Sequence, residues 1–146
     1  MLAARYPEKI RSAQDLRAHD CFIVKYNAEG QNSLAKHMDE SAFSFTIALN
    51  DRSEYEGGGT CFEAIRLKGS GNQYEPLTLN ADAGGVVAFP GTIRHGGDPV
   101  TNGTRYIIPL FLYLYENKSG KPIGYVFDNL EPLVEVAQKR RRQISM

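Results

Sequence analysis

Two polar residues in the first third of the chain have the types and spacing of metal ligands. His37 and Asp39 form a His-x-Asp pair. In an extended segment, side chains two residues apart project from the same face. One imidazole nitrogen and one carboxylate oxygen could then bind a single metal ion. Short pairs of this kind arise by chance in many chains, so the hypothesis needs a third ligand.

His95 is the candidate third ligand. It follows the apolar run at 84–91, GGVVAFPG. In a two-sheet roll, a residue that ends a later strand can return to the mouth where the first pair lies. Two histidines and one carboxylate occupy one face of an octahedron and leave three positions open, as in non-haem Fe(II) oxygenases. A structural zinc site usually has four ligands, often cysteines, and neither Cys21 nor Cys61 has suitable spacing. His95 therefore completes a candidate catalytic and metal-binding triad.

Arg105 lies ten residues after His95 and opens the apolar segment at 105–115, RYIIPLFLYLY, in which Ile107 and Pro109 are expected to face inward. A buried guanidinium requires an anion, and its planar fork suits a carboxylate. Taken alone, Arg105 is explained equally well by a surface salt bridge to Asp or Glu. The triad favours the interpretation that Arg105 binds a ligand.

Several motifs occur in a recognisable order: KY at 25–26, His-x-Asp at 37–39, ALN at 48–50, YEGGG at 55–59, and a late histidine followed ten residues on by the arginine of GTRY. The stretch at 22–112 resembles the catalytic domain of 2-oxoglutarate-dependent prolyl and lysyl hydroxylases. In pattern it is most similar to the procollagen lysyl hydroxylase domain.

This resemblance implies a fold and a role for each matched residue. The fold is an all-β double-stranded β-helix, or jelly roll, with short terminal helices. His37, Asp39 and His95 match the iron ligands, and Arg105 matches the base that pairs with the distal carboxylate of 2-oxoglutarate. Tyr26 matches a tyrosine whose hydroxyl reaches the same carboxylate, although an ordinary strand aromatic would also explain it.

The resemblance also implies the cofactors and the reaction. Fe(II), 2-oxoglutarate and O2 would be used, with ascorbate as reductant, and a C–H bond would be hydroxylated while 2-oxoglutarate yields succinate and CO2. The expected substrate is a prolyl or lysyl side chain of a protein or peptide. A free amino acid or another small molecule is the alternative substrate, and a catalytically silent metal-binding jelly roll that serves as an interaction module is a further alternative. The segment at 118–146 matches nothing in the family pattern.

Short β-type segments separated by Gly, Asn, Asp and Pro indicate a sandwich or barrel. We expect a short helix at 8–18 and a closing helix at 130–142. The expected strands are 21–26, 42–50, 60–67, 76–80, 84–90, 105–115 and 121–127.

Three other features have less specific interpretations. His19, beside Asp20, is expected to have a structural or solvent-exposed role. The glycines at 57–59 favour a backbone bend, with possible approach of substrate, over a phosphate loop, which would need a following helix and lysine. The basic run at 139–142 is more typical of a solvated helix end than of a phosphate-binding patch.

The composition fits one globular domain over residues 1–146. Seventeen basic and seventeen acidic residues balance, which gives no argument for nucleic acid as a partner. No apolar run is long enough to span a membrane, and the first sixteen residues lack the apolar centre of a secretory signal. We therefore expect a cytoplasmic protein with both cysteines reduced. If the chain is an excised domain of a secreted protein, a disulfide between them is possible.

Overall fold

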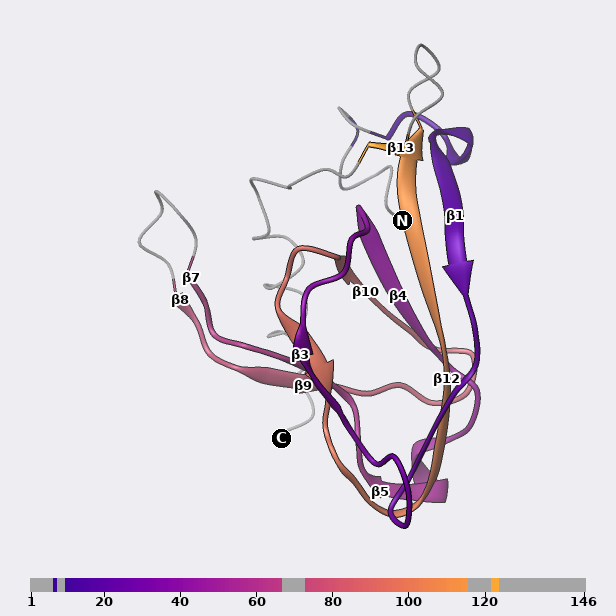
Figure 1. Cartoon of the computed structure of the whole chain (residues 1–146), viewed down its shortest axis with the longest axis vertical. Helices are drawn as coiled ribbons and strands as arrows, with labels where there is room; N and C mark the ends of the chain where they lie inside the picture. The colour runs from indigo at the N-terminus through magenta and orange to yellow at the C-terminus, as the bar shows by residue number, and fades with distance from the viewer. Residues whose placement is uncertain (1–6, 8–9, 67–72, 116–121, 124–146) are drawn as a thin grey trace.

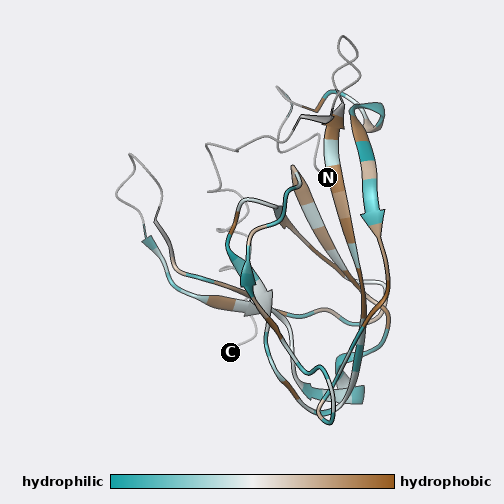
Figure 2. Cartoon of the chain, viewed as in Figure 1, coloured by the Kyte–Doolittle hydropathy of each residue, from teal (hydrophilic) through white to brown (hydrophobic). Residues whose placement is uncertain are grey.

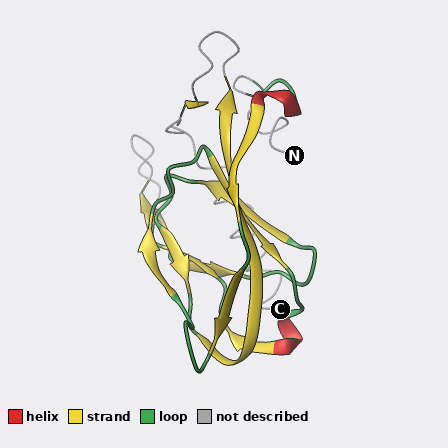
Figure 3. Cartoon of the chain, turned by 45° about the vertical axis from the view of Figure 1, so that its right-hand side comes forward, coloured by secondary structure: helices red, strands yellow, loops and turns green. Residues whose placement is uncertain are grey.

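The computed structural model describes residues 7, 10–66, 73–115 and 122–123. Strands dominate this part of the chain, and helix is limited to two 3-10 turns, η1 (Ala13–Asp15) and η2 (Arg52–Glu54) (Figure 3). Neither is long and apolar enough to cross a membrane. The strands form two main antiparallel sheets, so the predicted all-β jelly roll is confirmed.

The larger sheet has seven strands built around β12 (Val100–Tyr115). Its main path runs β1 (Leu16–Cys21), β12, β4 (Phe43–Ala48), β10 (Val86–Pro90) (Figure 1). The other three strands, β2 (Val24–Asn27), β5 (Tyr55–Gly57) and β13 (Pro122–Ile123), also pair with β12. A strand of 16 residues is long enough to pair with β1 near one end and with β5 near the other.

The smaller sheet has four short strands in the order β3 (Leu34–His37), β11 (His95–Gly97), β6 (Thr60–Phe62), β9 (Leu77–Leu79). A separate two-stranded ribbon, β7 (Ile65–Arg66) and β8 (Gln73–Tyr74), extends away from both sheets in Figure 1. The smaller sheet therefore places the segment that contains His37 directly beside the segment that contains His95.

An apolar cluster joins the two sheets. Phe62 and Leu77 come from the smaller sheet, Val87 and Phe89 come from β10 of the larger sheet, and Ile93 lies in the turn that connects them. Each of these side chains is buried, and burying a large apolar side chain stabilises a fold by roughly 1.5–3 kcal/mol. In Figure 2, apolar residues follow β10 and the upper part of β12, whereas β1 is mostly hydrophilic. The connection between β10 and β11 is thus fixed by core packing.

The prediction of a helix at 8–18 is wrong beyond a single turn. Ser12 and Asp15 form a capping box that closes η1, and the chain then extends into β1, where Leu16 lies opposite Leu114. Pairing with the long β12 outweighs the helix propensity of this polar segment, because propensity is a weak preference that tertiary contacts override. The internal turn η2 also departs from the expectation that helices occur only at the termini.

Strand boundaries differ at several other places. The expected strand at 21–26 is interrupted between β1 and β2, and the strand at 60–67 divides into β6 and β7. Strands β3, β5, β8 and β11 were not expected, since each has only two to four residues. The expected helix at 130–142 lies outside the described residues, as does the basic run within it. Only Pro122 and Ile123 of the expected strand at 121–127 are described.

Candidate active site

Two cross-strand neighbours form the first part of the site. His37 ends β3 and lies opposite His95, which begins β11, with ring centroids 4.6 Å apart. The Nδ1 atoms lie 2.8 Å from the backbone carbonyl oxygens of Ala35 and Ile93, respectively. A carbonyl can only accept, so Nδ1 is the protonated nitrogen and Nε2 keeps its lone pair. Both rings are therefore oriented to bind a metal through Nε2.

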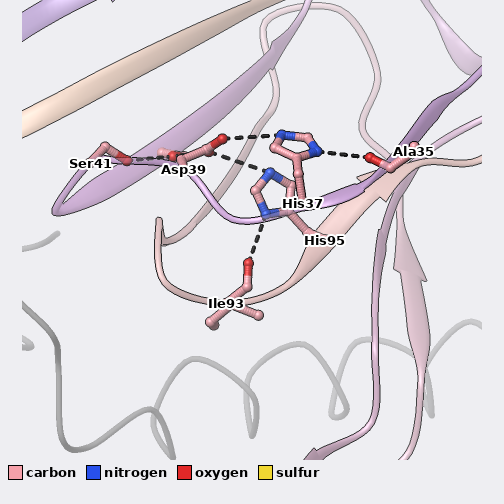
Figure 4. Close-up of polar contacts among 7 residues, drawn as sticks. Ala35, His37, Asp39, Ser41, Ile93 and His95 are labelled. Carbon is pink, nitrogen blue, oxygen red and sulfur yellow. Dashed lines mark hydrogen bonds and ion pairs between the residues drawn. The ribbon is translucent and has the colours of Figure 1, made fainter.

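Asp39 completes the cluster two residues after β3. Its Oδ1 lies 3.2 Å from Nε2 of His37, and its Oδ2 lies 3.4 Å from Nε2 of His95 (Figure 4). One potential ligand atom from each of the three residues lies within 4.8 Å of the others. The side chain of Asp39 is only 7% exposed, and its backbone N–H donates to the carbonyl of Gly91 at 2.9 Å. The predicted triad therefore converges in space.

The environment of His95 favours its neutral form. The ring is buried against Phe89, with centroids 4.4 Å apart. Burial lowers the pKa of His95, and this effect outweighs the opposing effects of the Ile93 carbonyl and of Asp39. Neutral imidazole is the form that ligates metals, so the site does not have to remove a proton from this ring near neutral pH.

Arg105 lies in the interior of a strand, not at its head as predicted, because β12 begins at Val100. Its side chain is 3% exposed, and its Nε has no hydrogen-bond partner. No Asp or Glu among the described residues lies within ion-pair distance of it. A buried charge without a counter-ion is costly. Within the described part of the chain Arg105 therefore makes no surface salt bridge, and its buried charge has no counter-ion.

Tyr26 is the cross-strand partner of Arg105, on β2. The guanidinium carbon of Arg105 lies 5.9 Å from the centre of the Tyr26 ring. A Cβ atom on Gly97 would lie 3.4 Å from the Tyr26 hydroxyl, which places this hydroxyl beside β11. Burial raises the pKa of Tyr26, although Arg105 opposes the shift. The hydroxyl therefore stays protonated near neutral pH and can donate a hydrogen bond.

One cavity of about 160 Å³ unites these groups. The triad, Arg105 and Tyr26 all line it. Most of the remaining wall is apolar and consists of Phe22, Val24, Leu34, Phe45, Phe89, Ile107, Pro109 and Phe111. Ile107 and Pro109 thus face the site as predicted.

Three hydroxyl residues in the cavity wall, Ser44, Thr46 and Thr60, were missed by the sequence analysis. Ser44 and Thr46 alternate with apolar residues along β4. Side chains of a strand alternate between its two faces, so this alternation could have placed both hydroxyls on one face. Nothing in the sequence around Thr60 singles it out.

The triple glycine forms a bend, as predicted. Gly57, Gly58 and Gly59 have φ angles of +73°, +65° and +120°, a region that other residues rarely adopt. A Cβ on Gly58 would lie 3.2 Å from Cδ of Arg105. The bend therefore passes close to the buried arginine, and a larger residue would press on it.

The remaining singled-out residues lie outside the triad. His19 is exposed on β1, where its ring meets the ring of Tyr113 edge-on with centroids 4.9 Å apart. Cys21 is exposed, Cys61 is buried, and both are free thiols. Burial raises the pKa of Cys61, and a hydrogen bond with Asp98 adds to the rise. Its thiol is therefore protonated and unreactive near neutral pH.

A jelly roll with two histidines and a carboxylate in one cavity defines the class of non-haem, metal-dependent oxygenases. A family model described as the 2OG-Fe(II) oxygenase superfamily matches residues 21–113. The chain belongs to the 2OG-Fe(II) oxygenase superfamily.

Curated relatives are hydroxylases of much greater length. A multifunctional procollagen lysine hydroxylase and glycosyltransferase from Caenorhabditis elegans is 39% identical over 103 residues, which are 68% of this chain and 13% of the relative. Procollagen-lysine,2-oxoglutarate 5-dioxygenase 2 from Homo sapiens is 38% identical over 94 residues, 62% of this chain and 12% of the relative. The chain thus spans about an eighth of the length of these relatives.

Solved structures show the same fold at low sequence identity. An oxidoreductase of the 2OG-Fe(II) oxygenase family from Burkholderia pseudomallei aligns with a TM-score of 0.52 at 18% identity, covering 66% of this chain and 44% of that one. A nickel complex of the non-heme monooxygenase ThoJ aligns with a TM-score of 0.54 at 14% identity, covering 88% and 65%.

Proposed function

We propose that the chain is a 2-oxoglutarate-dependent hydroxylase in which His37, Asp39 and His95 hold Fe(II). Arg105, assisted by Tyr26, holds the distal carboxylate of 2-oxoglutarate. The observation that carries this proposal is that one cavity contains both a set of metal-ligand atoms and a buried positive charge. Three ligand atoms converge at one place, and a buried guanidinium, which has no counter-ion among the residues that the structure describes, lines the same cavity.

The donor set fits the metal. Two neutral imidazoles and one carboxylate suit Fe(II) and leave positions open for a chelating co-substrate and for O2. Each imidazole is already oriented by a backbone carbonyl. Such outer partners are typical of metal-binding histidines, because they fix the tautomer and the ring orientation.

The co-substrate fits the other part of the cavity. A dicarboxylic acid can place one carboxylate near the metal ligands and the other against Arg105, whose planar fork suits a carboxylate. The Tyr26 hydroxyl, protonated near neutral pH, can donate to the same group. The aromatic walls exclude water, which strengthens both contacts.

When bound, Fe(II) and 2-oxoglutarate would allow O2 to hydroxylate a C–H bond, with one oxygen atom entering the product and the other entering succinate as CO2 is released. The chain contributes the ligand geometry, the anion-binding pair and a dry cavity. Ascorbate, as reductant, would keep the metal in the ferrous state.

The substrate we propose is a prolyl or lysyl side chain of a protein or peptide. Two considerations support this choice. The relatives are named as lysine hydroxylases, and the cavity opens beside apolar side chains that are partly exposed, Phe22 (48%) and Leu34 (42%). An aliphatic side chain carried on an extended peptide would pack against these residues.

The test measures succinate formation by the purified chain with Fe(II), ascorbate, O2 and 2-oxoglutarate. Prolyl and lysyl peptides are compared with free proline and free lysine, and mass spectrometry checks each substrate for one added oxygen atom. We expect succinate and hydroxylated peptide in equal amounts. Hydroxylation of a free amino acid with no reaction on any peptide would refute the peptide substrate, and the absence of 2-oxoglutarate turnover with every substrate would refute the reaction class.

A further inference from the structure

A pair of buried serines lies behind the carboxylate of the triad. Ser44, on β4, donates a hydrogen bond to Oδ2 of Asp39. The hydroxyl oxygens of Ser44 and Ser41 lie 2.8 Å apart. The two serines are 2% and 3% exposed, so water does not compete with these bonds.

The direction of both bonds follows from counting protons. A serine hydroxyl has one proton to donate. Ser44 gives its proton to Asp39, and Ser41 must therefore donate to Ser44. The hydroxyls form a chain that points toward the carboxylate, and aligned hydrogen bonds of this kind strengthen one another.

The backbone holds the two serine hydroxyls in place. The N–H of Asp39 donates to the carbonyl of Gly91 at 2.9 Å, and the N–H of Gly91 donates to the carbonyl of Ala42 at 3.4 Å. A Cβ on Gly91 would lie only 2.4 Å from both the hydroxyl and the carbonyl oxygen of Ser41. Since only glycine fits there, the turn after β10 lies directly against the segment that carries the serines.

We propose that Ser44, supported by Ser41, is a positioning residue for the metal ligand Asp39. The hydrogen bond occupies Oδ2 and leaves Oδ1 as the single oxygen that binds the metal. A carboxylate that bound through both oxygens would fill a position that the co-substrate or O2 needs. This inference rests on the proposed function, because it takes Asp39 as a ligand.

The test measures the affinity of the whole chain for Co(II) without co-substrate, together with the visible absorption spectrum of the bound ion. Ser44→Ala is expected to weaken binding by at least tenfold, as loss of an outer partner commonly costs 10–100-fold, and to change the spectrum. Ser44→Thr keeps the hydroxyl and should restore both properties. Ser41→Ala should have a smaller effect, because it removes only the second bond of the chain.

Thr46→Val is the matched control. It removes a hydroxyl from the same strand and the same cavity. The Thr46 hydroxyl does not belong to the hydrogen-bonded pair that reaches Asp39, so Co(II) affinity and the absorption spectrum should match the wild type. Ser44→Val, which has the shape of Ser44→Thr without the hydroxyl, replaces Ser44→Ala in the comparison if the alanine variant does not fold.

The outcomes separate this inference from the proposed function. Wild-type affinity and spectrum in Ser44→Ala, or in Ser44→Val, would overturn the role of the serines while the metal site stands. Failure of the wild-type chain to bind Co(II), or undiminished binding by His37→Ala, would overturn the proposed metal site itself.

Discussion

The two ends of the cavity differ in how well their polar groups are satisfied. At the metal end, each histidine bonds a backbone carbonyl, and Asp39 accepts from Ser44 and lies beside both rings. At the other end, Arg105 is buried and its Nε has no hydrogen-bond partner. Tyr26 is its neighbour on the adjacent strand β2. The triad is held by hydrogen bonds on its outer atoms and turns three ligand atoms toward one another, whereas Arg105 is a buried charge without a counter-ion among the described residues.

This difference has a physical consequence. The carbonyls of Ala35 and Ile93 and the hydroxyl of Ser44 hold the triad side chains with or without a metal, so this part of the cavity should keep its geometry. If Arg105 binds the co-substrate as proposed, removing the co-substrate leaves a buried guanidinium uncompensated, which lowers stability. On this account the triad is preorganised, and Arg105 trades stability for binding of an anion.

Replacing a ligand should have the largest effect. His37→Ala is expected to abolish 2-oxoglutarate turnover and to reduce metal binding below detection, because one of three ligands is lost. The fold should survive, since this side chain is 38% exposed. Turnover assays and circular dichroism check this result, and His19→Ala, which changes an exposed histidine outside the triad, is the control. Activity of His37→Ala equal to that of His19→Ala would contradict the assignment.

Removing the uncompensated charge of Arg105 should give the next largest effect. The expected change is an increase in stability. Arg105→Met is expected to raise the unfolding free energy of the free protein by about 1 kcal/mol or more, since apolar replacements of buried charges are often stabilising. Arg105→Lys keeps a charge and should bring no such gain. Denaturant unfolding measures all three proteins, and a destabilised Arg105→Met would show that the guanidinium has a structural partner.

Stabilisation by bound 2-oxoglutarate tests the same difference between the two ends of the cavity. At about 100 times its dissociation constant, a ligand stabilises the folded state by about 2.7 kcal/mol. 2-Oxoglutarate should therefore raise the melting temperature of the metal-loaded wild type and leave that of Arg105→Met nearly unchanged. An equal rise in melting temperature in both proteins would show that the binding energy comes from residues other than Arg105.

Gly58→Ala tests the packing behind Arg105. The residue has φ +65°, and a Cβ would lie 3.2 Å from Cδ of Arg105. Gly84 has φ +79° with nothing within 4 Å, so Gly84→Ala has the backbone strain without the contact. Each variant should lose about 1–2 kcal/mol of stability through its left-handed backbone. Only Gly58→Ala should also weaken 2-oxoglutarate binding, and equal affinities in the two variants would contradict the proposed contact.

Tyr26→Phe should have the smallest effect. It removes one hydroxyl, and a neutral hydrogen bond contributes about 0.5–1.5 kcal/mol. We therefore expect 2-oxoglutarate affinity to fall by a few-fold, with metal affinity unchanged. Because burial keeps the hydroxyl protonated, the ratio of wild-type to variant affinity should stay constant from neutral to mildly alkaline pH. A ratio that falls over this range would indicate a tyrosine that ionises.

The sequence singled out the side chains that line one cavity better than it predicted the strands that carry them. His37, Asp39, His95 and Arg105 were identified from residue type, order and resemblance, because the chemistry allows few substitutes. Strands β3 and β11, which place the two histidines opposite each other, have only four and three residues. Such short segments have little periodicity of their own, and their pairing is decided by contacts between distant parts of the chain.

The N-terminal segment and the serines show two further limits. Residues 16–18 were expected to be helical because local propensity was the only guide, whereas pairing with β12 decides their conformation. The bond from Ser44 to Asp39 depends on the turn at Gly91, which no local pattern reveals. Sequence patterns therefore identified the polar groups that converge on the cavity, and tertiary packing determined what supports them.

The central claim is that Arg105 recognises the distal carboxylate of a co-substrate bound at the triad. The most direct measurement compares anaerobic binding of 2-oxoglutarate and of 2-oxopentanoate, which lacks that carboxylate, to the Fe(II)-loaded wild type and to Arg105→Met. We predict that the wild type binds 2-oxoglutarate far more tightly, by about 2–5 kcal/mol for a buried charge pair, and that Arg105→Met binds both acids equally weakly. An equal preference for 2-oxoglutarate in both proteins would contradict the claim.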